Sequence, residues 1–267
     1  MMSNASAMAV EANVESTGSL PSLEILGPRA EICFRRPDVH NRVQPEDIVE
    51  LNRHFDRIEA DPAVRVVVFS GSEKAFSSGF HLGVLRGSGD GARQFEALTD
   101  RLESLRPITI AKVNGPVYGG ATDLVMSCDF RYGRIGVQMF MPAAKLGLHY
   151  YPHGLRRWVS RLGLGAAKKL FLTSSTISHA EMLAIGYLDE VHESARLDHA
   201  VNTLVDKILA QAPTVSARMK QVLNAVARQE YDDEFARGGF ELSLGSQDLR
   251  EGLASWAEKR IPNFKGA

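Results

Sequence analysis

The chain is poor in cysteine, with only Cys33 and Cys128 among its 267 residues. Both lie in apolar segments and lack the short spacing of paired metal ligands. No pair of histidines shows a helical or turn spacing supported by acidic residues, so we expect no metal site. We expect two buried free thiols in a reducing compartment, and therefore a cytoplasmic protein.

Long apolar runs and an excess of charge of one sign are also absent. No apolar stretch approaches the ~20 residues that a membrane-spanning helix needs, so we expect no membrane partner. The 31 basic residues are balanced by 32 acidic ones, which gives a formal net charge of −1 without a basic stripe. This balance removes the electrostatic argument for nucleic acid as a partner.

The phosphate-loop signatures of nucleotide-binding enzymes are missing as well. Neither G-x-G-x-x-G nor G-x-x-x-x-G-K-[ST] occurs in the sequence, so we expect no nucleotide cofactor. What remains is an ordinary globular composition, with 44% hydrophobic and 24% charged residues. Residues 1–20 are small, polar and unpatterned, and we expect them to form a disordered tail.

The residue pattern in the first half of the chain predicts short strands mixed with helices. Two apolar segments around Gly27 and Pro28 predict a β-hairpin. Pro45 opens an amphipathic helix that continues to about Ala60. Residues 64–71 are almost continuously β-branched, which is typical of a strand buried on both faces. The pattern indicates an α/β fold.

Two predicted strands lead directly into loops that contain glycine. The strand at 64–71 precedes the loop at 75–82, and the strand at 108–113 precedes the loop at 114–120. The two units are about 45 residues apart along the chain. This spacing favours a repeated β-β-α layout over the alternation of a Rossmann sheet.

The second glycine loop ends in Gly119 and Gly120, directly before a short predicted helix at 122–128. Backbone N–H groups at such a helix start have no partner within the helix, and they can bind an anion or an oxygen that becomes one. The plainer interpretation is a turn that lets strand and helix pack closely. From this stretch alone the plainer interpretation is favoured.

Helices dominate the second half of the chain. We expect a strand pair at 130–133 and 137–140, then a loop rich in histidine and tyrosine at 142–154. Two helical segments meet near Gly163, and a capping box opens a further helix at 178–181. Beyond residue 197 the expected elements are helices at 197–212, 216–228 and 233–256.

Taken together, these segments resemble the crotonase superfamily, the family of enoyl-CoA hydratases and isomerases. The resemblance covers most of the chain from residue 23 to residue 266. The stretches that carry it, in order, are 64–71, 75–82, 114–124, 184–191 and 251–266. Each stretch is weak alone, but their order and spacing are specific.

The resemblance implies a crotonase-like spiral of β-β-α repeats with a C-terminal helical region. It divides the chain into a tail at 1–20, an α/β core at 21–195 and a helical region at 196–267. In the family that last region packs across a trimer, commonly paired into a hexamer, so a homo-oligomer is expected. The implied small-molecule partner is an acyl-CoA, a coenzyme A thioester bound as substrate, with no further cofactor.

The resemblance also assigns roles to residues of the two glycine loops and the tail. The backbone N–H groups of Phe80 and Gly120 would hold the thioester oxygen as an oxyanion hole. One such donor contributes on the order of 3 kcal/mol to transition-state stabilisation. The expected contacts with coenzyme A are Ala75, Ser77, Ser78, Phe264 and Lys265, the last two often reaching a neighbouring subunit.

The sequence departs from the family pattern at the positions of the two hydratase glutamates. The first is Asp123, one methylene shorter, and the second is Ala143, whose methyl group can neither donate nor accept a proton. Asp123 remains the leading acid/base candidate, and the alternative interpretation is a residue that caps free N–H groups of its helix. His149, followed by Tyr150, is the candidate from the aromatic loop, because imidazole transfers protons near neutral pH.

Three functions therefore stay open. The first is an acyl-CoA enzyme that stabilises a thioester enolate, in which one carboxylate suits isomerisation better than water addition. The second is C–C cleavage, decarboxylation or thioester hydrolysis assisted by His149. The third is an acyl-CoA-binding protein without catalysis, which the alanine at position 143 motivates.

Overall fold

The structure is a computed structural model, and it describes residues 18–72, 75–81, 83 and 90–267. The expected tail falls largely outside these residues. The first strand, β1, spans Ser19–Leu26, so the predicted boundary at residue 20 lies inside a strand. Both cysteines are free, with Cys128 buried as expected and Cys33 half-buried.

A six-stranded sheet forms the centre of the molecule, in the order β1-β2-β3-β4-β6-β9. Its strands after β1 are β2 (Arg29–Arg35), β3 (Val66–Gly71), β4 (Ile108–Val113), β6 (Phe130–Arg134) and β9 (Glu190–His192). The pair β1–β2 is antiparallel and all the other neighbours are parallel. Leu26 pairs with Arg29 across the predicted hairpin turn, so both the hairpin and the α/β class are confirmed.

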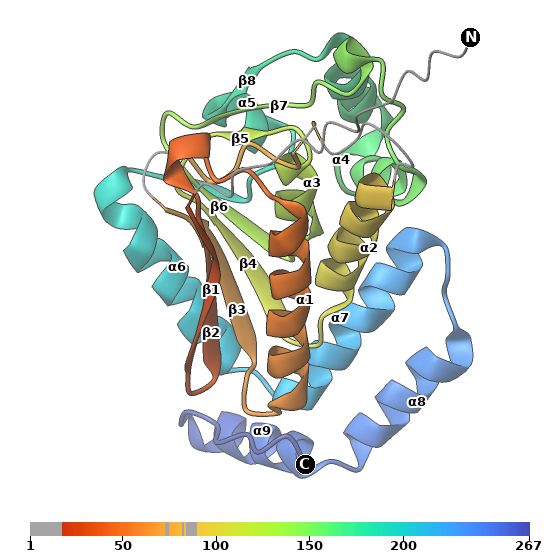
Figure 1. The fold of residues 1–267 in the computed structure, drawn as a ribbon. Helices are drawn as coiled ribbons and strands as arrows, with labels where there is room; N and C mark the ends of the chain where they lie inside the picture. Colours follow the sequence, from red (N-terminus) through yellow and green to blue (C-terminus); the bar gives the residue numbers. More distant parts are fainter. Residues whose placement is uncertain (1–17, 73–74, 82, 84–89) are drawn as a thin grey trace, which may run out of the picture.

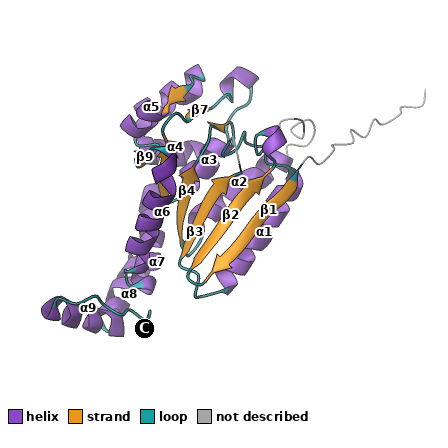
Figure 2. Cartoon of the chain, turned by 90° about the vertical axis from the view of Figure 1, so that its left-hand side faces the viewer, coloured by secondary structure: helices purple, strands orange, loops and turns teal. Residues whose placement is uncertain are grey.

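Helices cover both faces of this sheet because its central strands are apolar on both sides. In β3, Val67 and Phe69 pack into the larger core, whereas Val66 and Val68 pack into a second cluster beneath α6 (Ser194–Leu209). The larger core also includes α1 (Pro45–Ala60), α2 (Asp90–Ser104) and α3 (Ala121–Ser127). Figure 2 shows α1 and α6 on opposite sides of the strands.

A smaller sheet lies at one end of the molecule and corrects one prediction. It contains β5 (Val117–Tyr118), β7 (Gln138–Phe140) and β8 (Ile177–Ser178). The predicted pairing of the strands at 130–133 and 137–140 is therefore wrong. Strand β6 already has β4 and β9 on its two sides, so it has no free edge for β7.

The connecting helices follow the predicted sequence signals. Helix α4 (Pro152–Thr173) is interrupted at Gly163, whose φ of 78° is outside the helical range. The capping box expected at 178–181 opens α5 (His179–Ala184), where Ser178 and Glu181 each accept a backbone N–H of the other residue. Two 3-10 turns, η1 (Pro37–Val39) and η3 (Ala144–Leu146), complete the connections that the structure describes.

The C-terminal helices are α7 (Pro213–Arg228), α8 (Asp233–Leu244) and α9 (Gln247–Glu258). Figure 1 shows α7 and α8 along one flank of the molecule and α9 at the end farthest from the small sheet. The single helix predicted at 233–256 is wrong, because the chain breaks at Gly245 and Ser246 caps a new helix by accepting the N–H of Leu249. Helix α6, assigned to the C-terminal region, packs on the central sheet instead.

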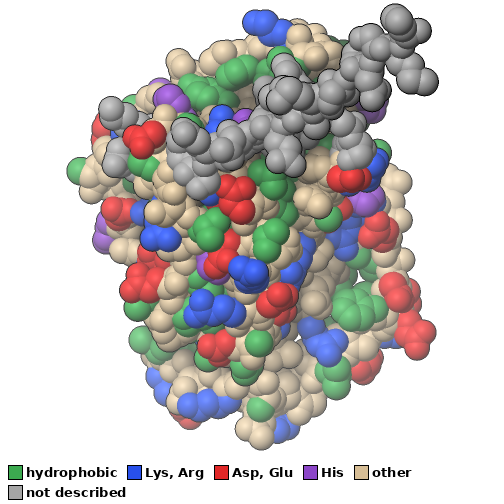
Figure 3. All heavy atoms as spheres, in the orientation of Figure 1, with side chains coloured by type: hydrophobic (Ala, Val, Ile, Leu, Met, Phe, Trp, Pro, Cys, Tyr) green, Lys and Arg blue, Asp and Glu red, His purple; other side chains and the backbone are tan. Residues whose placement is uncertain are grey.

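The surface carries charges of both signs. Figure 3 shows basic and acidic side chains interspersed over the face it presents. Among the helices that the structure describes, none combines the length and the apolar character that crossing a bilayer requires.

Candidate active site

The two glycine loops meet at one edge of the central sheet. Strands β3 and β4 are parallel neighbours, so the loops that follow them start from the same edge. Tyr118 N–H donates to the Ser77 carbonyl oxygen at 3.0 Å, and Phe76 N–H donates to the Pro116 carbonyl oxygen at 3.1 Å. These backbone bonds fix one loop against the other.

Gly79 is the point of closest approach between the loops. Its φ is +84°, and a Cβ atom there would lie 2.6 Å from both the Gly120 nitrogen and the Tyr118 carbonyl oxygen. Only glycine accommodates both this backbone conformation and this contact. As a result, the Phe80 nitrogen lies 3.4 Å from the position that a Cβ on Gly120 would occupy.

The N–H groups of Phe80 and Gly120 are adjacent and have no acceptor within the described part of the chain. The neighbouring donors are satisfied: Gly119 N–H donates to Phe140 and His81 N–H donates to Val43. Two adjacent, unpaired backbone donors suit an oxygen atom that gains negative charge. The structure thus brings these two backbone nitrogens close together, and the oxyanion-hole role that the resemblance implies for them stays a prediction.

These donors border a cavity of about 280 Å³. Its lining is largely aromatic and aliphatic: Ser78, Phe80, Ala92, Phe95, Tyr118, Gly119, Gly120, Phe140, Pro142, Leu148 and Tyr150. Four residues singled out from the sequence, Ser78, Phe80, Gly120 and Tyr150, thus share one cavity. An apolar wall strengthens hydrogen bonds to charge that develops inside it.

Two other predicted contacts support the loop without lining the cavity. The Ser77 hydroxyl is buried, donates to the Asn41 carbonyl oxygen at 2.6 Å and accepts the Gly79 N–H at 3.1 Å. The Ala75 carbonyl oxygen accepts from the Asn41 side-chain amide at 2.7 Å. Asn41 therefore holds the first glycine loop from the side of η1, a role that the sequence analysis missed.

Tyr150 connects the cavity to a buried hydrogen-bond chain. Its hydroxyl donates to the Tyr151 hydroxyl at 2.9 Å, and the Tyr151 hydroxyl donates to Oδ2 of Asp123 at 2.7 Å. Burial raises the pKa of Tyr150 and of Tyr151 well above the usual value near 10, and the charge of Asp123 raises both further. Both hydroxyls are therefore neutral over the physiological pH range.

Asp123 lies at the inner end of this chain and is fully buried. Oδ2 also accepts from Nη1 of Arg157 at 2.5 Å, and Oδ1 accepts from the Trp158 indole nitrogen at 3.0 Å. Asp123 is not among the residues that line the cavity. Among the described residues, Tyr151 and Tyr150 connect the carboxylate to the cavity.

Arg157 joins Asp123 to two further acids, Asp100 and Glu103, at 2.8 Å and 3.2 Å. Burial opposes the charge of Arg157, but the surrounding carboxylates outweigh it and raise its pKa. The pKa of the Glu103 carboxyl is raised by burial and lowered by the charges of Arg157 and Arg161. The arginines have the larger effect together, so this pKa lies below its ordinary value. This network fixes the start of α4 against α2 and α3.

Ala143 and His149 flank the cavity without contributing a reactive group to it. Ala143 is buried in the core directly after Pro142, which does line the cavity. His149 is exposed, and its Nδ1 lies 2.8 Å from the Tyr150 carbonyl oxygen. Among the described lining residues there is neither a carboxylate nor an imidazole.

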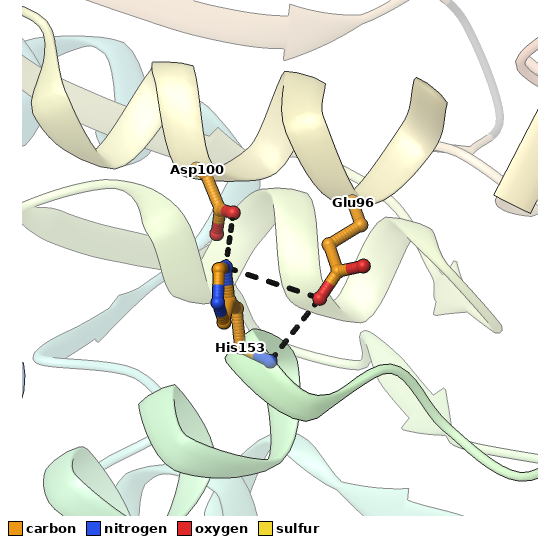
Figure 4. A group of neighbouring side chains, drawn as sticks. All are labelled: Glu96, Asp100 and His153. Atoms are coloured by element: carbon orange, nitrogen blue, oxygen red, sulfur yellow. Dashed lines mark hydrogen bonds and ion pairs between the residues drawn. The ribbon is translucent and has the colours of Figure 1, made fainter. Parts of the chain in front are cut away.

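A second polar cluster, which the sequence did not indicate, joins α2 to α4 (Figure 4). Glu96 and Asp100 of α2 face His153 of α4. One carboxylate oxygen of each acid and one ring nitrogen of His153 all lie within 4.8 Å of one another. His153 Nδ1 lies 2.5 Å from Asp100 Oδ2, and the His153 N–H donates to Glu96 at 3.2 Å. Because Asp100 also binds Arg157, this cluster extends the same ion-pair network to the surface.

The predicted tail contacts lie away from this cavity within a single chain. The Phe264 ring packs beside Gly252 of α9, and Lys265 lines a different cavity together with Arg65 and Arg106. The structure therefore brings together the loop part of the predicted coenzyme A site but not its tail part.

Comparison with known proteins places this geometry in a family. The enoyl-CoA hydratase/isomerase family matches residues 29–267, which is most of the chain. The chain belongs to that family. It is thus an acyl-CoA enzyme of the crotonase superfamily, and its fold, including the helical C-terminal region, agrees with that of solved relatives.

Its relatives of known function include two hydratases. The chain is 29% identical to the short-chain-enoyl-CoA hydratase of Clostridium acetobutylicum, with 91% of this chain and 97% of the relative covered. It is 28% identical to the crotonyl-CoA hydratase of Syntrophomonas wolfei, with 88% and 94% covered. An enoyl-CoA hydratase structure from Bacillus anthracis superimposes with a TM-score of 0.85 at 24% identity, covering 93% of this chain and all of the other.

Proposed function

We propose that the protein binds an acyl-CoA thioester with its carbonyl oxygen between the N–H groups of Phe80 and Gly120. The observation that carries the proposal is the pair of adjacent backbone donors, unpaired within the described residues, at the wall of an apolar cavity. Removing a proton next to the thioester carbonyl makes an enolate, and two preorganised donors stabilise its oxygen.

We further propose that Tyr150 is the polar group that acts on the acyl part of the substrate. Its proton is committed to Tyr151 and the proton of Tyr151 is committed to Asp123, so the Tyr150 oxygen is oriented to accept a hydrogen bond. When the Tyr150 oxygen takes the proton removed from the substrate, its own proton passes to Tyr151 and the Tyr151 proton passes to the Asp123 carboxylate, which is paired with Arg157. The reverse transfers return a proton to the product carbon. Asp123 and Tyr151 act through Tyr150 and do not touch the substrate.

The proposed reaction is an enolate reaction such as double-bond isomerisation rather than hydration by a carboxylate pair. Ala143 stands beside the cavity where a second carboxylate would be needed to hold the water. A methyl group cannot hold or deprotonate water. His149-assisted cleavage or hydrolysis is less favoured, because the exposed His149 does not line the cavity.

The first test follows the ultraviolet absorbance of crotonyl-CoA, because water addition removes the conjugated enoyl chromophore. The proposal expects tight, saturable thioester binding with slow or no loss of absorbance. It also expects turnover of a 3-enoyl-CoA to the conjugated 2-enoyl-CoA, seen as a gain in absorbance. Fast hydration of crotonyl-CoA would overturn the isomerase part, and failure to bind any thioester would overturn the whole proposal.

One observation favours a second candidate, a thioester-binding protein without catalysis. No carboxylate or imidazole lines the cavity in the described part of the chain, so proton transfer depends on tyrosine alone. This candidate predicts saturable binding without product from any thioester in a broad panel. A single product detected from that panel rules it out.

We also propose a homotrimer, alone or paired into a hexamer, built through the C-terminal helices. Large apolar side chains are exposed on α7, α8 and α9, with Trp256 at 87%, Leu223 at 67% and Leu253 at 64% exposure. Exposed apolar surface of this kind marks protein interfaces. Phe264 and Lys265 would then contact coenzyme A bound by a neighbouring subunit, and light scattering after size exclusion tests the assembly.

A further inference from the structure

A second cavity lies at the opposite edge of the central sheet from the candidate active site. Its volume is about 450 Å³, and it is bounded by the residues that precede β3 and β4, the start of α7 and the C-terminal tail. Strands β3 and β4 run from this cavity toward the glycine loops. Each strand has six residues, so the two sites are about 20 Å apart.

The lining of this second cavity carries charge of one sign. Four of its residues are cationic, namely Arg65, Arg106, Arg218 and Lys265, and none of its lining residues is acidic. Within the described residues, none of the four forms an ion pair at 4.0 Å or less. In a chain with a net charge of −1, such a concentration of positive charge is a specific feature.

Two of the four cations are held in place by backbone carbonyl groups. Arg65 donates through Nη2 to the Gln211 carbonyl oxygen at 2.5 Å, while its buried Nε has no partner in the described structure. Arg106 donates to the Val64 carbonyl oxygen at 3.0 Å and the Asp61 carbonyl oxygen at 2.9 Å. These bonds fix the two guanidinium groups, and carbonyl groups do not neutralise their charge.

The other two cations have free donors. The Arg218 guanidinium and the Lys265 ammonium make no hydrogen bond within the described residues. Two carboxylates lie near the cavity without lining it: the charge of Asp248 acts on Arg65, and the charge of Glu251 acts on Lys265. Asp248 also accepts the backbone N–H groups of Lys265 and Gly266 at 2.7 Å and 2.9 Å. Four cations against two carboxylates leave an excess of positive charge at the cavity.

We infer that this cavity is a binding site for a phosphorylated small molecule, with Arg218 and Arg65 as its principal phosphate ligands. Guanidinium groups match the oxygen geometry of a phosphoryl group, and a dianion would balance the clustered positive charge. The first N–H groups of the 16-residue helix α7 lie in the same wall and add to the favourable field. The volume accommodates more than inorganic phosphate alone.

The occupant we infer is a free phosphorylated metabolite. Coenzyme A bound by another copy of the chain carries the same phosphoryl chemistry, and the second titration below distinguishes it from a free metabolite. The inference does not depend on turnover, so its failure is distinguishable from failure of the proposed function.

The test is calorimetric titration of the whole protein with pyrophosphate in a phosphate-free buffer. We expect saturable binding that weakens with salt and falls at least tenfold in Arg218→Ala. The matched control is Arg237→Ala on α8, an exposed arginine paired with Asp233 outside the cavity, which should bind like the unaltered protein. No saturable binding, or an equal loss in both variants, would overturn the inference.

A second titration with crotonyl-CoA and crotonyl-pantetheine tests the occupant. For a free metabolite, both thioesters bind Arg218→Ala unchanged while pyrophosphate binding is lost. Weaker binding of the CoA form alone in Arg218→Ala, with pyrophosphate competing with that form in the unaltered protein, would overturn the inference, because the cations would then serve coenzyme A. Equal weakening of both thioesters with pyrophosphate binding intact would contradict the inference.

Discussion

Oδ2 of Asp123 lies 2.5 Å from Nη1 of Arg157, and neither side chain has more than 2% of its surface exposed. Tyr151 connects Asp123 of this pair by hydrogen bonds to Tyr150, which lines the cavity. It ties the helix that follows the second glycine loop, α3, to the start of α4. The ion pair thus serves both the stability of the fold and the orientation of Tyr150.

Replacing Arg157 with methionine should destabilise the protein strongly. The substitution leaves the carboxylates of Asp123 and Glu103 buried without their cation. Breaking a buried pair from one side costs about 3–5 kcal/mol of unfolding free energy. Urea unfolding followed by circular dichroism measures the change.

The matched control is Arg237→Met, which removes an exposed arginine from its pair with Asp233 on α8. Surface pairs contribute little, so unfolding of this variant should be nearly unchanged. In the double variant with Asp123→Leu and Arg157→Met the loss should be smaller than in Arg157→Met alone. Equal stability of Arg157→Met and the control would show that the buried pair is not needed.

Gly79→Ala should disable thioester chemistry while Gly136→Ala should not. The two glycines have similar φ values, +84° and +89°, so both substitutions introduce similar backbone strain. Only at Gly79 does the new Cβ collide with the backbone nitrogen of Gly120, whereas Gly136 has open space around it. Loss of one oxyanion donor lowers kcat by about 10²–10³.

Steady-state turnover of the thioester identified as substrate provides the measurement, with circular dichroism to check folding. A comparable loss of activity in the two variants would assign the effect to strain alone. In that case the proposed oxyanion hole would lose its support.

The central part of the fold was predictable because its signals are local. The run of β-branched residues at 64–71 predicts a strand, and the glycines at 79 and 120 predict close turns. Each of these signals depends on residues that are near one another in the sequence. Since parallel neighbouring strands end at the same edge of a sheet, the meeting of their loops also follows. The cavity is the direct result.

The environment of Asp123 could not be predicted, because its partners are distant in the sequence. Arg157 is 34 residues further along the chain, and Trp158 is 35 residues further. Only packing of α4 on α3 brings them together. The cluster of Glu96, Asp100 and His153 has the same origin, since spacing within one helix says nothing about a facing helix. The role of Asp123 as acid or base stays a prediction.

Tyr150→Phe should reduce turnover more than it reduces substrate affinity. The substitution keeps the ring that lines the cavity and removes the hydroxyl that ends the chain to Asp123. General acid–base groups contribute about 10²–10⁴ in rate, so kcat should fall within that range while KM changes little. Tyr151→Phe should show a comparable fall, because it interrupts the path of the proton from Tyr150 to Asp123.

The control for the tyrosines is Tyr132→Phe, whose hydroxyl donates to Glu190 on the far side of the central sheet. Its rate should match that of the unaltered protein. The pKa of Tyr150 is well above 10, so the rate should also show no loss from tyrosine ionisation up to about pH 9. A fall in rate that is the same in Tyr132→Phe and Tyr150→Phe would argue against the proposed role.

Glu103 should account for part of the loss of stability in acid. Burial raises the pKa of its carboxyl, but Arg157, Arg161 and Arg228 together lower the folded-state value below the ordinary 4.5. A carboxyl with a lowered folded-state pKa stabilises the fold above the unfolded-state pKa, and this stabilisation is lost as pH falls toward the folded value. Unfolding free energy should therefore decline from about pH 5 downward.

Glu103→Gln should be less stable than the unaltered protein at pH 7 and should lose less stability between pH 5 and pH 3. Urea unfolding at a series of pH values measures both effects. Glu230→Gln is the comparison, because the pKa of Glu230 is also lowered by arginines but its side chain is 52% exposed. Solvent screens that pair, so its contribution to the acid slope should be small. Parallel pH profiles for Glu103→Gln and the unaltered protein would mean that the charge of Glu103 interacts equally with its surroundings in the folded and unfolded states.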